Sequence, residues 1–154
     1  YQDAAIMIVS RMSGEDQDTY RYFGDKFKND ACFDDNYMDL SKNEADILSN
    51  LKTLKENGKI KKIILLINST NALQFKNIKN YDIDACLWLG TGGNVSYEQV
   101  SYLLSGKANP SGHLSDTYVY DSFSSPVTEN FGDFTFFILI ITYSKLKNIP
   151  IDAV

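Results

Sequence analysis

Apolar runs rich in branched side chains recur along the chain, and longer polar segments separate them. Three of these runs are Ala4–Val9, Ile63–Asn68 and Asp84–Gly90. The first two are continuous instead of alternating, which is typical of strands that are covered on both faces of a parallel sheet. A weaker run over Gly112–Tyr120 predicts a fourth strand. The pattern therefore predicts a sheet that lies inside the molecule.

The segment between the first two runs has the spacing of an amphipathic helix. Its apolar residues over Glu44–Asn57 fall on one helical face, and they are Ile47, Leu48, Leu51 and Leu54. Ser41 and Glu44 have the S-x-x-E spacing of a capping box, in which each side chain accepts a hydrogen bond from the other residue's backbone N–H. Gly58 follows, as expected after a helix C-terminus.

A second helix is predicted over Tyr97–Ser105. Ser96 and Gln99 repeat the capping spacing before it, and Gly106 follows it. We expect its apolar residues to face inward, and they are Val100, Leu103 and Leu104. A short helix or turn is predicted over Leu73–Lys79. Because strands and helices alternate with mostly short connections, we predict an α/β fold with a mostly parallel sheet sandwiched by helices, in the doubly wound manner.

The carboxyl ends of the predicted strands are where folds of this kind place their sites. The stretch SRMSGEDQD follows the first strand, and the glycine-containing loop GTGG ends the third. Glu15 stands in the first of these turns beside Gly14, whose missing side chain lets a ligand approach closely. Two interpretations stay open here. Glu15 is a reactive carboxylate, or it is a surface acid that pairs with Arg11.

The segment Tyr20–Leu40 interrupts the alternation of strands and helices. It is long for a connection between a strand and a helix, and loops of that length tend to be functional or disordered. Six aromatic residues stand in it among acids, namely Tyr20, Tyr22, Phe23, Phe27, Phe33 and Tyr37. Aromatic side chains with polar tips stack on the faces of sugars, and they equally pin a long loop to its own domain.

Composition argues against several classes of protein. A chain of 154 residues has the size of one domain, and its net charge of -5 does not favour nucleic acid, which binds basic surfaces. One histidine and two cysteines give little material for a metal site or a Ser-His-Asp triad. Cys86 is expected as a small buried core residue and His113 as a loop residue. The run Phe134–Tyr143 is about half as long as a membrane span, so it predicts a strand or buried segment and no membrane partner.

Motifs for cofactors and metals are incomplete. In LWLGTGGN the dinucleotide fingerprint needs a third glycine where Val95 stands, and the sequence has no phosphate-loop motif. An acidic cluster is present at Asp30, Asp34, Asp35 and Asp39. It lacks the alternating positions and central glycine of a calcium-binding loop. We therefore expect no cofactor and no metal.

Several stretches in register resemble one known family. AAIMIVSRMSGEDQD is similar to a strand followed by S-R-x-S-G-E, and LLINSTNAL is similar to the next strand and loop. The long stretch IDACLWLGTGGNVSYEQVSYLLSGKANPSGHLSDTY is similar to a segment that ends in L-x-G-x-x-N-P-S-G-x-L-x-D-T, and YVYDSFSSPVTENFGDF continues it. Together they resemble the C-terminal α/β-sandwich domain of family 3 glycoside hydrolases, the β-glucosidase family. We predict this domain over residues 1–133 and a divergent apolar tail over residues 134–154.

The resemblance implies chemistry that is divided between two domains. A TIM barrel carries the aspartate nucleophile, and the sandwich domain supplies the acid/base glutamate, which by motif position is Glu15. Retaining cleavage needs two carboxyl groups about 5–5.5 Å apart, one to attack the sugar and one to protonate the leaving oxygen. Arg11, Tyr20 and Tyr22 are predicted to bind the β-glucoside or oligosaccharide substrate. Without the barrel, we expect the isolated chain to be inactive.

Three positions depart from the family pattern. Asp16 and Thr19 replace the glycine and arginine that often follow the glutamate, and His113 stands where the family often has arginine. A negative charge at Asp16 would favour the protonated form of Glu15, which suits a proton donor. The loss of the arginine would loosen the loop.

A second class of function stays open beside the catalytic one. The chain would then be a non-catalytic carbohydrate-binding or dimerisation module, in which the aromatic residues of the Tyr20–Leu40 segment bind the ligand. An exposed apolar strand in the tail would invite pairing with another chain, so a homodimer is a further expectation. A flavodoxin-like nucleotide binder has no support in the glycine spacing.

Overall fold

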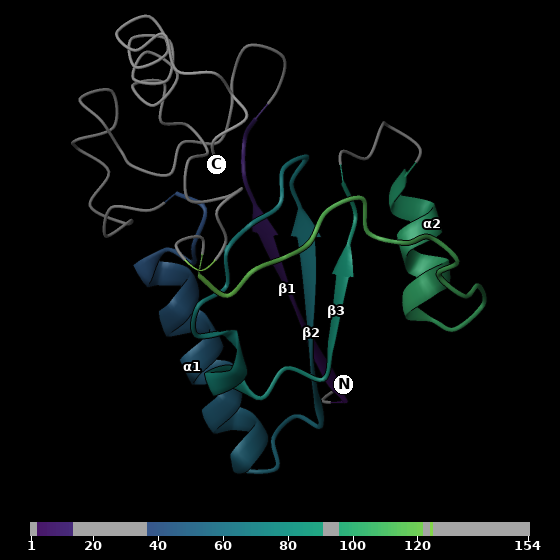
Figure 1. Cartoon of the computed structure of the whole chain (residues 1–154). Helices are drawn as coiled ribbons and strands as arrows, with labels where there is room; N and C mark the ends of the chain where they lie inside the picture. Colours follow the sequence, from purple (N-terminus) through teal and green to yellow (C-terminus); the bar gives the residue numbers. More distant parts are fainter. Residues whose placement is uncertain (1–2, 14–36, 91–95, 122–123, 125–154) are drawn as a thin grey trace, which may run out of the picture.

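A parallel sheet of three strands forms the centre of the described part of the chain (Figure 1). The computed structural model describes residues 3–13, 37–90, 96–121 and 124. The strands are β1 (Ala4–Ser10), β2 (Lys62–Asn68) and β3 (Ala85–Trp88), in the spatial order β1-β2-β3. Both neighbouring pairs are parallel. The strands predicted from the first three apolar runs are confirmed.

The register of the sheet decides which side chains share a face. Val9 pairs with Ile67, and Ile67 pairs with Trp88, so these three side chains lie in one row across the sheet. Ile8 and Leu66 form the preceding row, which faces the opposite side because side chains alternate along a strand. The face that carries Val9 and Ile67 holds the buried core, since both side chains are almost inaccessible to solvent.

Helix α1 (Lys42–Glu56) covers this core face. The predicted capping box is present: the Ser41 hydroxyl accepts from the Glu44 N–H at 3.2 Å, and the Glu44 carboxylate accepts from the Ser41 N–H at 2.8 Å. Leu48 is fully buried, whereas Ile47 is 49% exposed and Leu54 is 42% exposed. The apolar face of α1 is therefore narrower than the sequence predicted, because Ile47 and Leu54 lie at its flank.

Helix α2 (Ser96–Leu104) lies toward the other face of the sheet. Val100 and Leu103 are half-buried and line a hollow together with Ile8 of β1. Leu104 is exposed, so the expectation that it faces inward is wrong. With α1 on one face and α2 toward the other, the chain has the predicted α/β-sandwich architecture.

The connection from β2 to β3 packs into the core before it forms a helix. Leu73 and Phe75 are buried there in irregular chain, and a short 3₁₀ helix, η1 (Ile78–Tyr81), follows them. The predicted short helix over Leu73–Lys79 thus begins later than expected. The first residues of that range bury apolar side chains instead of forming a helical turn.

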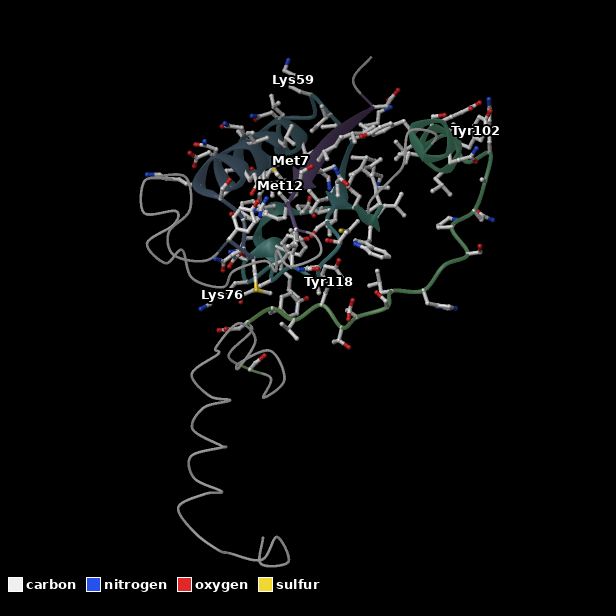
Figure 2. The ribbon with its side chains drawn as sticks, turned by 90° about the horizontal axis from the view of Figure 1, so that it is seen from above. Met7, Met12, Lys59, Lys76, Tyr102 and Tyr118 are labelled. Carbon is white, nitrogen blue, oxygen red and sulfur yellow. The ribbon has the colours of Figure 1, made fainter. Side chains whose placement is uncertain are left out.

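The weak fourth strand predicted over Gly112–Tyr120 is wrong, because these residues form irregular chain. The segment is held to the core by single side chains instead of a ladder of backbone hydrogen bonds. Tyr118 stacks on Phe75 with ring centroids 6.3 Å apart, and Lys79 lies 4.5 Å from the Tyr120 ring centre. Figure 2 shows Tyr118 between this returning segment and the rest of the fold.

Two further expectations concern single residues. Cys86 is exposed, so the expectation that it is a buried core residue is wrong. Partial desolvation nevertheless raises the pKa of its thiol, which disfavours the reactive thiolate. His113 lies in irregular, exposed chain, as predicted for a loop residue. The described helices include none with the length and apolarity to cross a bilayer, and the predicted strand Phe134–Tyr143 is outside the described residues.

Candidate active site at the carboxyl ends of the strands

Polar residues gather where the three parallel strands end. Because the strands run in the same direction, the residues after each of them reach the same edge of the sheet. The Asn68 side chain donates to the Ser10 hydroxyl at 3.3 Å, and the hydroxyls of Ser13 and Thr70 are hydrogen-bonded to each other. This edge, which we call the carboxyl rim, is formed by residues 10–13, 68–70 and 89–90.

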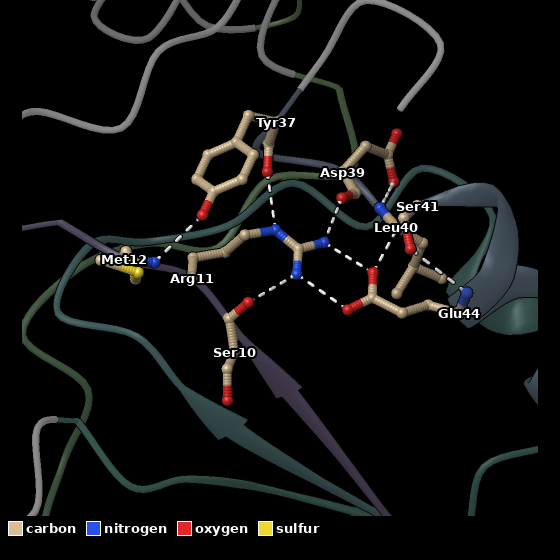
Figure 3. A network of polar contacts seen from close by, with 8 residues as sticks. All are labelled: Ser10, Arg11, Met12, Tyr37, Asp39, Leu40, Ser41 and Glu44. Carbon is tan, nitrogen blue, oxygen red and sulfur yellow. Dashed lines mark hydrogen bonds and ion pairs between the residues drawn. The ribbon is translucent and has the colours of Figure 1, made fainter. Parts of the chain in front are cut away.

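Arg11 is the first residue after β1, and its side chain is the centre of the best-connected polar network at the rim (Figure 3). The backbone N–H of Arg11 donates to the Asn68 carbonyl at 3.1 Å, which continues the pairing of β1 with β2 by one residue. The side chain turns away from solvent and is only 1% exposed. A buried guanidinium requires several hydrogen bonds to offset the loss of hydration.

The guanidinium of Arg11 makes five hydrogen bonds to described acceptors. Nε donates to the Tyr37 carbonyl at 2.8 Å, and Nη2 donates to the Asp39 carbonyl at 2.6 Å. Nη1 donates to the Ser10 carbonyl at 2.8 Å. The remaining two hydrogen bonds run in parallel to the two carboxylate oxygens of Glu44, at 2.8 and 2.7 Å. An arginine side chain has five N–H groups, so each of them has a protein acceptor.

Glu44 serves two functions in this arrangement. Its carboxylate caps the start of α1 by accepting from the Ser41 N–H, and it also binds Arg11 in the bidentate fork that carboxylates form with guanidinium groups. Burial by itself would raise the pKa of Glu44. The hydrogen bonds from Arg11 and Ser41 outweigh burial, so the pKa of this carboxyl lies below its ordinary value. Glu44 is therefore a stable anion that fixes α1 to the end of β1.

Tyr37 adds a second link between the rim and the chain before α1. Its hydroxyl accepts from the Met12 N–H at 3.1 Å, and its ring lies 5.4 Å from the centre of the Arg11 guanidinium. Tyr37 is one of the six aromatic residues of the long segment, and the structure shows it pinned to the domain. The other five lie at residues 20–33, which the structure does not describe.

Asp39 carries a second, partly buried carboxyl group near the rim. It accepts from the Leu40 N–H at 2.8 Å and from the Gln74 side chain at 3.2 Å. Burial raises the pKa of Asp39, and these hydrogen bonds only partly oppose that effect. Asp39 thus holds its proton more readily than an exposed aspartate. The described hydrogen bond from Arg11 goes to the backbone carbonyl of Asp39 and not to this carboxyl group.

The end of β3 is shaped by Trp88 and Gly90. The indole N–H of Trp88 donates to the Ser69 carbonyl at 2.8 Å, which fixes the ring against the chain that leaves β2. Gly90 has a φ of +62°, and a Cβ at this position would lie 3.3 Å from the Trp88 ring. Both the backbone angle and the close ring favour glycine here. The remaining residues of the GTGG loop, 91–93, lie outside the described residues.

A hollow of about 370 Å³ opens beside the rim, between the sheet and α2. Three polar side chains, those of Ser10, Asn68 and Gln99, reach it from β1, β2 and α2. Trp88 and the exposed Tyr97 are the aromatic residues among those that line it. Its volume is within the range of small-molecule sites, and its lining is mostly apolar.

The opposite edge of the sheet holds a separate charged network. Lys55 near the end of α1 contacts Asp84 at 2.7 Å and Asp82 at 2.9 Å, and Lys62 contacts Asp84 at 2.7 Å. Asp84 also accepts from the Ile63 N–H at 2.9 Å. The hydrogen bonds from Lys55 and Lys62 hold the pKa of Asp84 well below its ordinary range. This network joins α1 to β2 and the start of β3, far along the strands from the carboxyl rim.

The predicted site residues divide into two groups. Arg11 lies at the rim with its five hydrogen bonds, whereas Glu15, Tyr20 and Tyr22 lie in residues 14–36, outside the described part of the chain. Sequence reasoning missed Glu44 as the partner of Arg11. The capping signal at Ser41 and Glu44 predicted one function of this glutamate, but no local spacing points to a partner 33 residues away. Within the described ranges no three His, Cys, Asp or Glu residues are grouped to hold a metal ion.

Comparison with known sequences identifies the family. The sequence profile described as "Glycosyl hydrolase family 3 C-terminal domain" matches residues 1–141. The chain belongs to glycosyl hydrolase family 3. A curated β-glucosidase of Ruminococcus albus, similar to this family 3 chain, is 29% identical to it over 129 residues. That alignment covers 84% of the chain but 12% of the relative, so the chain spans about an eighth of the length of the protein that it matches.

Membership of family 3 confirms the resemblance seen in the sequence and agrees with the parallel sheet between helices. It places the carboxyl rim, with Arg11 and the start of the segment that carries Glu15, in the C-terminal domain of the family. The family match does not assign roles to individual residues.

Proposed function

We propose that this family 3 domain is part of a retaining β-glucosidase-like hydrolase and that Glu15 is its acid/base residue. The observation that carries the proposal is the position of β1, which delivers the chain to the carboxyl rim at Ser13. Glu15 follows Ser13 by two positions in the sequence, and two extended residues span about 7 Å at most. On this proposal the Glu15 carboxylate meets a substrate that a neighbouring domain holds beside the rim.

The proposed reaction needs two carboxyl groups with different duties. The first attacks the anomeric carbon and forms a glycosyl-enzyme, and the second protonates the oxygen of the leaving group. In the second step the same residue removes a proton from water, which then hydrolyses the intermediate. We assign the second carboxyl group to Glu15. The resemblance supplies the first as an aspartate of a TIM-barrel domain, which is the partner this proposal requires.

The substrate contacts remain predictions. Tyr20 and Tyr22 are proposed to contact a β-glucoside or oligosaccharide through their rings, which stack on sugar faces. Arg11 was predicted as a third contact. Since each of its N–H groups has a protein acceptor, a direct bond from Arg11 to the sugar would require the loss of one of those bonds.

The decisive experiment uses the longer enzyme that carries this domain, with Glu15→Gly. On a β-glucoside with a poor leaving group we expect kcat/KM to fall by about 10²–10⁴, the usual contribution of general acid–base catalysis. On an aryl β-glucoside with a good leaving group, departure needs no proton, so sodium azide should restore turnover by attacking the glycosyl-enzyme. The expected product is a β-glucosyl azide.

The control is Glu56→Gly, which removes a glutamate at the exposed C-terminal end of α1. This variant should keep the kcat of the parent enzyme and show no response to azide. If Glu15→Gly gives no glucosyl azide although the enzyme is folded, the acid/base assignment is wrong.

The hollow beside the rim favours a second candidate, a non-catalytic carbohydrate-binding module. The residues that line it include the aromatic residues Trp88 and Tyr97 and the polar residues Ser10, Asn68 and Gln99. Titration of the chain with glucose distinguishes the candidates. Saturable binding that is lost in Tyr97→Ala, and is indifferent to Glu15→Gly, would favour the binding module. A homodimer remains a prediction that sedimentation of the same sample would test.

A further inference from the structure

Arg11 connects the chain on both sides of the segment that carries Glu15. The arginine lies three residues before position 14, and two of its acceptors, Tyr37 and Asp39, lie one and three residues after position 36. Its hydrogen bonds therefore join the residue that leaves β1 to the residues that lead into α1 (Figure 3). The carboxylate of Glu44, inside the first turn of α1, completes the connection.

The connection is geometrically demanding. Two parallel hydrogen bonds to Glu44 fix the plane of the guanidinium, and the Nε bond to Tyr37 fixes its rotation within that plane. The Met12 N–H bond to the Tyr37 hydroxyl adds a second link between the same two parts of the chain. A lysine could keep the charge but not the fork, because its three donors sit on one atom.

We propose that Arg11 is a positioning residue that holds the two ends of the segment 14–36 at a fixed separation and thereby sets the position of Glu15. The expected effect on catalysis rests on the proposed function, but the expected effect on the separation of the two ends of the segment does not. On this proposal Arg11 does not contact the sugar, because its N–H groups are occupied by Ser10, Tyr37, Asp39 and Glu44. Arg11 affects the reaction only by fixing the ends of the segment that carries Glu15.

The first test measures the mechanical consequence in the 154-residue chain with Arg11→Lys. Segment 14–36 contains trypsin sites after Arg21, Lys26 and Lys28. We expect the initial rate of cleavage at these sites, followed by mass spectrometry at a temperature where the chain stays folded, to rise at least fivefold. Cleavage at the parent rate would overturn the proposal.

The matched control is Lys55→Met, which breaks a comparable charged network at the opposite edge of the sheet. Lys55 contacts two acidic side chains, and its side chain is 17% exposed against 1% for Arg11. It has no contact with the ends of segment 14–36 among its described partners. We expect Lys55→Met to lower the melting temperature while the cleavage rate at Arg21 changes less than twofold. An equal rise in both variants would mean general loosening and would overturn the proposal.

The second test measures the catalytic consequence in the longer enzyme. Misplacement of a catalytic group by about 1 Å costs up to about 10²-fold in rate, so Arg11→Lys should lower kcat at least tenfold and change KM less than threefold. A rise in KM with kcat preserved would identify Arg11 as a substrate contact and would overturn the positioning role.

A double variant tests whether Arg11 and Glu44 act together. We call the hydrogen bonds by which Arg11 and Glu44 join the end of β1 to the start of α1 the clamp. Because Arg11 and Glu44 act as one unit, Arg11→Lys combined with Glu44→Gln should lower kcat little more than either change alone. Additive losses would contradict the proposal. If Glu15→Gly shows no azide rescue while Arg11→Lys still accelerates cleavage, the acid/base assignment fails and the clamp stands as a structural device.

Discussion

At the scale of single residues, the main feature is a guanidinium that is buried beside one carboxylate. Arg11 is inaccessible to solvent and Glu44 is 17% exposed at its side chain, so removal of either partner leaves a charge with poor hydration. Loss of one member of a buried ion pair typically costs 3–5 kcal/mol, much more than loss of a surface pair. The Arg11–Glu44 pair therefore fixes α1 to the end of β1, and a substitution of either residue is expected to destabilise the fold.

Glu44→Gln should lower the free energy of unfolding by about 3 kcal/mol at pH 7. The folded-state pKa of Glu44 is below its ordinary value, so its contribution is complete above that ordinary value. The contribution is lost as pH falls through the lowered pKa of the folded state. The difference between parent and variant should thus shrink in the acid range below about pH 4.5, as urea unfolding at several pH values would show.

Glu56→Gln is the control for this prediction. Glu56 lies 3.8 Å from Lys52 on the exposed surface of the same helix, and such pairs contribute less than about 1 kcal/mol. If the two variants lost the same free energy at pH 7, the buried fork would not be the stabilising feature that the geometry indicates.

At the scale of elements, α1 packs on the sheet through a narrow apolar face. Leu48 is fully buried against the core face, and its neighbour Ile47 is half exposed. The start of the same helix carries Glu44, so packing along the helix and the clamp at its first turn act on one rigid element. A substitution that displaces α1 should therefore also displace the Glu44 carboxylate that binds Arg11.

Leu48→Ala should cost about 2–5 kcal/mol of unfolding free energy, the usual result of removing a buried leucine side chain. Ile47→Ala, one position earlier, should cost less than about 1 kcal/mol because its side chain already contacts water. Chemical denaturation of both variants measures the contrast. Equal losses would mean that α1 packs with a different face toward the sheet.

The returning segment is attached to the core by Tyr118. Burial raises the pKa of Tyr118 to about 12, with negative groups at Cys86 and Asp116 adding to the effect. The folded state keeps this proton longer than the unfolded chain, so the associated stability is complete below about pH 10 and is lost as pH rises through about 12.

Tyr118→Phe keeps the ring that stacks on Phe75 and removes the titrating group. Its unfolding free energy should therefore fall less steeply than that of the parent protein between pH 10 and pH 12. Circular dichroism during thermal unfolding at a series of alkaline pH values gives the comparison. Identical pH dependence in the two proteins would show that Tyr118 is not the group responsible.

At the scale of the whole molecule, the proposed chemistry is divided between this domain and a barrel. The chain spans about an eighth of the β-glucosidase that it resembles, and the proposal takes the nucleophile from outside it. The 154-residue chain should accordingly release no aryl alcohol from an aryl β-glucoside above the uncatalysed rate, as a spectrophotometric assay would show. Turnover that disappears in Glu15→Gly would contradict the division of labour.

The sequence predicted the elements that depend on close neighbours. The continuous apolar runs predicted β1 and β2, and the spacing of Ser41 and Glu44 predicted the start of α1, because strand pattern and capping are local. The predicted strand over Gly112–Tyr120 failed, because apolar residues there pack singly and do not pair their backbones with a neighbour. The exposure of Cys86 likewise depends on what packs over β3, which its own strand does not reveal.

For the site, the family motif led to Arg11 as a predicted substrate contact, but it did not point to the described partners of the Arg11 side chain. Glu44, 33 residues away, meets Arg11 only when α1 folds back onto the sheet, and nothing in the spacing of a capping box encodes that encounter. Glu15, Tyr20 and Tyr22 came from the family motif and from aromatic composition. Their roles stay predictions, since these residues lie outside the described ranges.

The clamp has a consequence for how relatives can diverge. Arg11 and Tyr37 touch across the base of the segment between them, so the length of the intervening chain is uncoupled from the packing of β1 and α1. Doubling the length of a flexible loop between fixed ends costs only about 0.6 kcal/mol. Insertions and deletions between these two residues should therefore be tolerated during evolution, and substrate preference could change there while the sandwich below is preserved.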